Sequence, residues 1–162
     1  MRIMGIDSSS QKTGIALYDG KLRHYELIDY SHVRDYDTRF NSMVADIQKI
    51  IEREQPDVVY AEDTWESKGG KFNNTATLKK LSYIVGAIRC ICLQKDIPFN
   101  LIYPSEWRKT VGISIANNKR GKLKELSIDY VAENYGAEVN DDVADAICIA
   151  EAGYILNCNL FE

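Results

Sequence analysis

Apolar runs along the chain predict strands in five places. Three come early, with a Ser-rich turn joining the first two. These early runs are Arg2–Asp7, Thr13–Tyr18 and Lys21–Ile28. Two shorter runs follow, Asp57–Glu62 and Pro98–Tyr103. The first of these two has the continuous apolar character that is typical of a buried parallel strand.

Between and after these runs, apolar residues recur every three or four positions, which predicts helices. The predicted helices are Asp35–Glu54, Thr75–Lys95, Pro104–Val111, Lys119–Tyr135 and Asp141–Leu156. Strands that first pair as hairpins and then alternate with helices indicate an α/β fold. We therefore expect a mixed five-stranded sheet covered by helices.

The predicted helix Thr75–Lys95 carries apolar residues on two faces. One stripe runs from Leu78 to Cys92, and a second, also largely apolar, runs from Lys80 to Ile91. A helix with two apolar faces is either buried on both sides or in contact with a partner subunit. Under the second alternative, this helix is the candidate subunit interface.

Length and composition are those of one globular domain spanning residues 1–162, because the 162 residues are 45% hydrophobic and no repeat or linker interrupts them. The N-terminal segment is too short and polar for a signal peptide, and no apolar run approaches the ~18 residues of a membrane span. The four cysteines lie in apolar stretches without zinc-ligand spacing. We expect a cytoplasmic protein with reduced thiols and no membrane contact.

The net charge of −4 hides a strong segregation of basic residues. Five basic residues and no acidic one lie between Lys68 and Arg89, and six basic residues accompany two acidic ones between Tyr103 and Glu125. This pattern fits a basic surface for a polyanion, although a solvated charged face would look the same.

Four carboxylates stand where acids are costly or grouped. Asp7 and Glu62 each end an apolar strand, and an ionised carboxylate on a buried strand needs a cation or hydrogen bonds. Asp142 and Asp145 are three residues apart in the last predicted helix, so their side chains point the same way. For this pair alone, favourable placement of acids in a first helical turn is an alternative explanation.

Together, the four carboxylates and the lack of a catalytic His or Cys motif indicate hard-cation chemistry. Oxygen ligands suit Mg²⁺ or Mn²⁺ rather than zinc. Two such ions about 3.5–4 Å apart can activate a water molecule and stabilise the leaving oxygen of a phosphodiester. The carboxylates therefore predict metal-dependent phosphodiester hydrolysis.

Three motifs in the order GIDSSSQKTGIAL, PDVVYAED and DDVADAICIA resemble the RuvC-type Holliday junction resolvases of the RNase H-like superfamily. The resemblance covers nearly the whole chain and includes NTATLKKLSYIVGAI and YPSEWRKTVG. It implies an RNase H-like fold with helices on both faces of the sheet. It also implies a homodimeric endonuclease that resolves four-way DNA junctions by paired symmetric nicks, leaving 5′-phosphates. Ser8-Ser9 replaces the usual Pro-Gly of cellular members, which suggests a divergent bacteriophage-type branch acting in a bacterial host's cytoplasm.

By this resemblance, the catalytic and metal-binding residues are Asp7, Glu62, Asp142 and Asp145. They would hold two Mg²⁺ ions, with Mn²⁺ as a substitute. Asp141 lies outside the matched pattern and is expected to cap the last helix.

The resemblance also implies a set of DNA-binding residues, in which an aromatic side chain stacks on an unpaired base and basic side chains neutralise phosphates. The set is Trp65, Lys68, Lys71, Phe72, Arg108, Lys109, Lys119, Arg120 and Lys122.

Three other functions stay open at this point. The same fold could cut flaps, other branched DNA or RNA–DNA hybrids, or the chain could bind junctions without cutting them. The segment Asp7–Gly14 also faintly resembles the phosphate loop of actin-like ATPases, but the chain is too short for the two lobes of that fold. We therefore expect no nucleotide cofactor.

Overall fold

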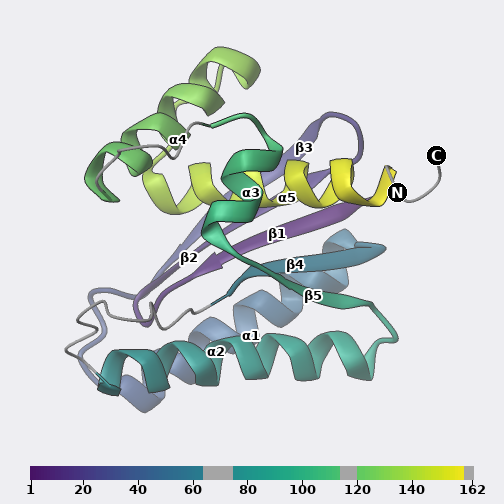
Figure 1. Cartoon of the computed structure of the whole chain (residues 1–162). Coiled ribbons are helices and arrows are strands. Elements are labelled where there is room, and N and C mark those ends of the chain that lie inside the picture. Colours follow the sequence, from purple (N-terminus) through teal and green to yellow (C-terminus); the bar gives the residue numbers. More distant parts are fainter. Residues whose placement is uncertain (64–74, 114–119, 159–162) are drawn as a thin grey trace.

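The computed structural model describes residues 1–63, 75–113 and 120–158. In these residues, five strands form one mixed sheet in the order β3-β2-β1-β4-β5 (Figure 1). The strands are β1 Ile3–Ser8, β2 Lys12–Tyr18, β3 Leu22–Asp29, β4 Val58–Glu62 and β5 Phe99–Ile102. The predicted mixed five-stranded sheet is confirmed.

The central strand β1 has an antiparallel neighbour on one side and a parallel neighbour on the other. It pairs with β2 so that Asp7 lies opposite Gly14, and with β4 so that Ile6 lies opposite Ala61. The outer pairs continue this division, because β2 and β3 are antiparallel whereas β4 and β5 are parallel.

The helices cover both faces of the sheet. They are α1 Tyr36–Glu54, α2 Thr75–Gln94, α3 Pro104–Thr110, α4 Arg120–Tyr135 and α5 Asp141–Cys158. Helices α1 and α2 lie on one face, and α3, α4 and α5 lie on the other (Figure 1). Every predicted strand and helix is present in the described residues, and no end differs from the prediction by more than two residues.

Local sequence signals explain where α1 begins and ends. The Asp35 side chain accepts a hydrogen bond from the Thr38 backbone N–H at 2.8 Å, which satisfies one free donor of the first turn. Gln55 closes the helix in the left-handed conformation, with φ of 47°. The apolar face of α1, including Met43 and Ile47, is buried against the sheet.

Helix α2 buries residues of both predicted apolar stripes within the chain, including Cys92 of the first and Ile91 of the second. Ile84 and Ile88 are buried in the core between α1, α2 and the sheet. Tyr83 and Leu93 remain 57% and 60% exposed. The surface of α2 therefore still offers large apolar side chains to a partner.

Helix α5 is buried on all sides over its middle section, since every residue from Val143 to Ala150 is buried. Helix α5 lies between the sheet and the pair α3 and α4 (Figure 1). Apolar residues are therefore needed around the whole helix. Even so, none of the described helices is long and apolar enough to cross a membrane.

Two glycines let the backbone of α5 touch the sheet. A Cβ atom on Gly5 would lie 2.3 Å from the carbonyl oxygen of Ala146, and one on Gly14 would lie 2.0 Å from that of Asp142. Both distances are too short for any side chain. Since Gly14 is paired with Asp7, this contact brings the first turn of α5 beside Asp7.

We expect Gly14→Ala to lower the free energy of unfolding by about 1–3 kcal/mol, because the added methyl group pushes α5 off the sheet. Denaturant unfolding measures this change. The matched control is Gly86→Ala on α2, where an added Cβ has nothing within 4 Å. The control should be stabilised by about 0.5–1 kcal/mol, as expected for Ala in place of Gly within a helix. Similar changes in both variants would contradict the account of Gly14.

Candidate active site

The side chains of Asp7 and Glu62 point toward the same face of the sheet. Gly5 contacts α5, and side chains alternate along a strand, so Asp7 also faces α5. In β4, Tyr60 lies beside Gly153 of α5, so Glu62 faces α5 as well. The parallel pairing of β1 with β4 then places Asp7 and Glu62 side by side where the two strands end.

Helix α5 supplies two further carboxylates above this point. The backbone of Asp142 rests on Gly14, and Asp145 follows one turn later, 5% exposed. Asp145 is too deep and too far along α5 to serve as a first-turn acid. That alternative explanation therefore does not apply to it.

The cap of α5 is not Asp141, as we expected from the sequence. The side-chain oxygen of Asn140 accepts a hydrogen bond from the Val143 backbone N–H at 3.0 Å. The Asp141 carboxylate instead forms an ion pair with Lys124 of α4. The expected cap was therefore wrong by one residue, because α5 begins at Asp141 and the residue before it, Asn140, is in the capping position.

Asp7, Glu62, Asp142 and Asp145 influence one another electrostatically, and we call them the carboxylate cluster. Burial raises the pKa of Asp7 well above its usual value, and the charges of Glu62, Asp145 and Asp142 raise it further. Burial also raises the pKa of Asp145 to about 6, with Ser127 and Arg108 opposing the shift. The pKa of Asp142 is raised by burial and by neighbouring Asp141. The charge of Asp7 is therefore coupled to each of the other three carboxylates.

Helix α3 holds two members of the cluster in place. The indole Nε1 of Trp107, a fully buried residue, donates a hydrogen bond to Glu62 Oε2 at 2.9 Å. The next residue, Arg108, places Nη2 3.4 Å from Asp145 Oδ2 and lies over the Trp107 ring, 4.1 Å from its centre. Sequence reasoning missed Trp107, although its position directly before a basic pair was a usable signal.

Comparison with known proteins identifies the family. The sequence model described as crossover junction endodeoxyribonuclease RuvC matches residues 3–152. The chain belongs to the RuvC family. Among curated family members of that name, the one from Xanthomonas axonopodis pv. citri is 26% identical over 158 residues, covering 92% of this chain and 84% of the relative. The one from Caldicellulosiruptor saccharolyticus is 26% identical over 157 residues, covering 93% and 90%.

Solved structures agree on the fold. RuvC of Thermus thermophilus, in complex with a Holliday junction substrate, matches with a TM-score of 0.78 and 17% identity, over 98% of this chain and 96% of that one. The yeast mitochondrial Holliday junction resolvase matches with a TM-score of 0.57 and 14% identity, over 99% and 84%. The expected RNase H-like fold of the RuvC family is therefore confirmed.

Within this RuvC fold, the expected DNA-binding residues lie in different surroundings. Lys109 is exposed on α3, and Lys122 is exposed on α4, where it pairs with Glu125 at 3.1 Å. Arg108 is 8% exposed and its ionic contact is Asp145, so it reaches the cluster from inside the protein. Outside the described residues lie Trp65, Lys68, Lys71, Phe72, Lys119 and the side chain of Arg120.

The cluster has the donor set for a hard divalent cation. Asp145 Oδ1 is buried without a hydrogen-bond partner in the described residues, an arrangement that a cation would satisfy. RuvC family nucleases are metal-dependent, which agrees with this donor set. No three His, Cys, Asp or Glu side chains of the described part already converge around a metal position.

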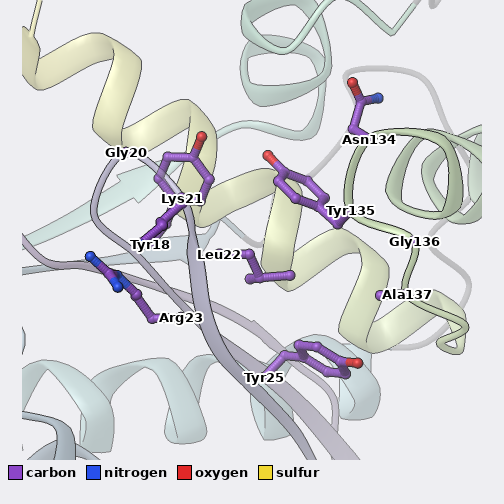
Figure 2. Close-up of a pocket in the computed structure, with 10 residues that line it drawn as sticks. All are labelled: Tyr18, Gly20, Lys21, Leu22, Arg23, Tyr25, Asn134, Tyr135, Gly136 and Ala137. Atoms are coloured by element: carbon purple, nitrogen blue, oxygen red, sulfur yellow. The ribbon is translucent and has the colours of Figure 1, made fainter.

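A pocket of about 530 Å³ lies elsewhere, between the β2–β3 turn and the end of α4 (Figure 2). Its lining includes Tyr18, Arg23, Tyr25 and Tyr135, and no member of the carboxylate cluster. Hence this pocket is separate from the candidate active site.

We expect Asp7→Asn to stabilise the metal-free protein at neutral pH. A carboxyl whose pKa is raised by folding binds its proton more tightly in the folded state, so stability falls as the pH rises above its unfolded pKa of about 4. Removing the charge should raise the melting temperature in EDTA by at least about 3 °C, equivalent to about 1 kcal/mol in a chain of this size.

The gain from Asp7→Asn should shrink as the pH falls and largely disappear at about pH 3, below the unfolded pKa, where the aspartate is protonated in both states. Asp129→Asn, at an exposed position on α4, is the control and should change little at either pH. A variant that melts at or below the wild-type temperature at neutral pH would show that Asp7 is not under electrostatic strain.

Proposed function

We propose that this chain is a divalent-cation-dependent endodeoxyribonuclease that resolves four-way DNA junctions by paired nicks, leaving 5′-phosphate ends. The observation that carries the proposal is the carboxylate cluster, assembled from β1, β4 and α5 in a chain of the RuvC family. The curated relatives are called crossover junction endodeoxyribonucleases, and the Thermus thermophilus structure contains a Holliday junction substrate. These names support four-way DNA as the substrate.

Within this proposal, Asp7, Glu62, Asp142 and Asp145 hold two Mg²⁺ ions, for which Mn²⁺ can substitute. When bound, such ions activate water and stabilise the leaving oxygen of a phosphodiester. The cluster itself supplies the negative oxygens that bind the ions. At neutral pH Asp145 is ionised despite its raised pKa of about 6, and the Arg108 charge favours that ionised form.

Trp107 acts on the cluster by orienting a ligand rather than by touching the DNA. Its hydrogen bond to Glu62 fixes one carboxylate oxygen, and full burial prevents the indole from moving. Residues that orient metal ligands in this way contribute strongly to affinity.

The proposal includes a homodimer, because two symmetric nicks require two active sites and a twofold dimer supplies them. Helix α2 is the candidate interface. The exposed side chains of Tyr83 and Leu93, at 57% and 60%, support this choice.

The direct test is nicking of a synthetic four-way junction with Mg²⁺ and with EDTA. Wild type should make paired nicks only with Mg²⁺. Asp7→Asn should bind the junction but nick it at least about a thousandfold more slowly, since bound metal contributes several kcal/mol of transition-state stabilisation. Asp129→Asn is the control and should nick normally.

Two results would contradict the proposal in different ways. Tight binding by the wild type without nicking would indicate a junction-binding protein. Equal cutting of a flap, a plain duplex or an RNA–DNA hybrid would keep the metal site and remove the preference for junctions.

We also expect Trp107→Phe to raise the Mg²⁺ concentration needed for half-maximal nicking by about 10–100-fold, because the aromatic packing stays and the hydrogen bond to Glu62 is lost. Nicking rates over a Mg²⁺ titration measure the change, with the melting temperature as a check on folding. An unchanged Mg²⁺ requirement in a folded variant would show that Trp107 only fills the core.

A further inference from the structure

Lys124 lies at the edge of the carboxylate cluster and is not among the residues that the sequence singled out. It belongs to α4, and its Nζ pairs with the carboxylate of Asp141, the first residue of α5. The next residue along α5 is Asp142, a member of the cluster. The side chains of Lys124 and Asp141 are 41% and 32% exposed, so solvent reaches this pair.

The charge of Lys124 acts on three members of the cluster. It lowers the pKa of Asp7, of Asp142 and of Asp145. In return, Asp141, Asp142 and Asp145 raise the pKa of Lys124, with the Asp141 hydrogen bond as the main cause. Lys124 is therefore protonated and electrostatically coupled to the cluster as a whole.

Two other described cations near the cluster are placed differently. Arg108 is buried and held between Asp145 and the Trp107 ring. Lys12 acts on Asp142, but it stands on β2 and pairs with Asp29 at 3.3 Å. Lys124, by contrast, is accessible to solvent and lowers the pKa of three of the four carboxylates in the cluster.

A phosphodiester that approaches four carboxylates is repelled unless cations compensate the charge, and the transition state of hydrolysis carries further negative charge. A lysine beside the reacting phosphate stabilises that charge. An ion pair as exposed as Lys124–Asp141 contributes little to stability. The ammonium group can therefore exchange the Asp141 carboxylate for a phosphate oxygen at small cost.

We propose that Lys124 binds a phosphate oxygen of the DNA strand at the carboxylate cluster and is a further catalytic residue. The inference rests on the proposed nuclease function. Asp141 is then the partner of the ammonium group in the DNA-free protein only, and it takes no part in binding or catalysis.

The test compares Lys124→Gln with wild type in two assays. Single-turnover nicking with Mg²⁺ should slow by about a hundredfold, as for removal of one preorganised donor. In EDTA, the slope of log junction affinity against log salt concentration should become shallower by about one, as for one lost phosphate contact. Lys124→Arg should restore part of the nicking rate, because it keeps the charge.

Two further variants separate a phosphate contact from a structural ion pair. Asp141→Asn removes the same pair but keeps the lysine, so it should retain both the salt dependence and most of the nicking rate. Lys49→Gln removes an exposed lysine that pairs with Asp46 at 3.0 Å on α1, away from the cluster, and should change neither assay.

Equal salt dependence in Lys124→Gln and Lys49→Gln would overturn the proposal. Equal losses of nicking in Lys124→Gln and Asp141→Asn would also overturn it, because they would show that the ion pair matters only for folding. The binding assay needs neither metal nor cleavage. Hence a wild type that binds without nicking would refute the proposed function, while the salt dependence would still decide whether Lys124 contacts phosphate.

Discussion

The arrangement of the whole site depends on one contact, in which the backbone of α5 lies directly on the sheet at Gly5 and Gly14. No residue with a side chain would allow this approach. The contact fixes the height of α5 above β1 and β2, and with it the distance between the carboxylates of α5 and Asp7. The same contact explains why α5 is buried on all sides, since the sheet covers it below while α3 and α4 cover it above. The fold and the site therefore share one cause.

This packing has an electrostatic cost. Four carboxylates are brought together where burial and mutual repulsion oppose their ionisation. Neighbouring groups offset part of this repulsion. Trp107 donates a hydrogen bond to Glu62, Arg108 contacts Asp145, and Lys124 pairs with Asp141 beside the cluster. A protein that only stabilised its fold would gain by replacing such acids with apolar residues. Bound cations, as proposed above, would offset this repulsion and would explain why the acids are kept together.

Much of this could be predicted from the sequence. Periodicity placed every strand and helix within one or two residues, because apolar alternation and helical spacing are local signals. Asp7 and Glu62 each stand at a strand end, which indicated that they share one edge of the sheet. The parallel pairing of β1 and β4 agrees with this prediction. Contacts between distant parts of the chain could not be predicted from the sequence in the same way. The hydrogen bond from Trp107 to Glu62 joins residues far apart in the chain, and the ion pair between Lys124 and Asp141 joins two different helices. In the sequence, Gly5 and Gly14 look like ordinary glycines within strands. Only the packing of α5 against them shows why no side chain fits there.

The central claim is that the carboxylate cluster binds divalent cations, and the most direct measurement counts them. Electron paramagnetic resonance of free Mn²⁺, titrated with protein in the presence and absence of a four-way junction, reports binding without any need for cleavage. We expect saturable Mn²⁺ binding by the wild type that is lost in Glu62→Gln and kept in Asp129→Asn. Equal Mn²⁺ binding by wild type and Glu62→Gln would contradict it.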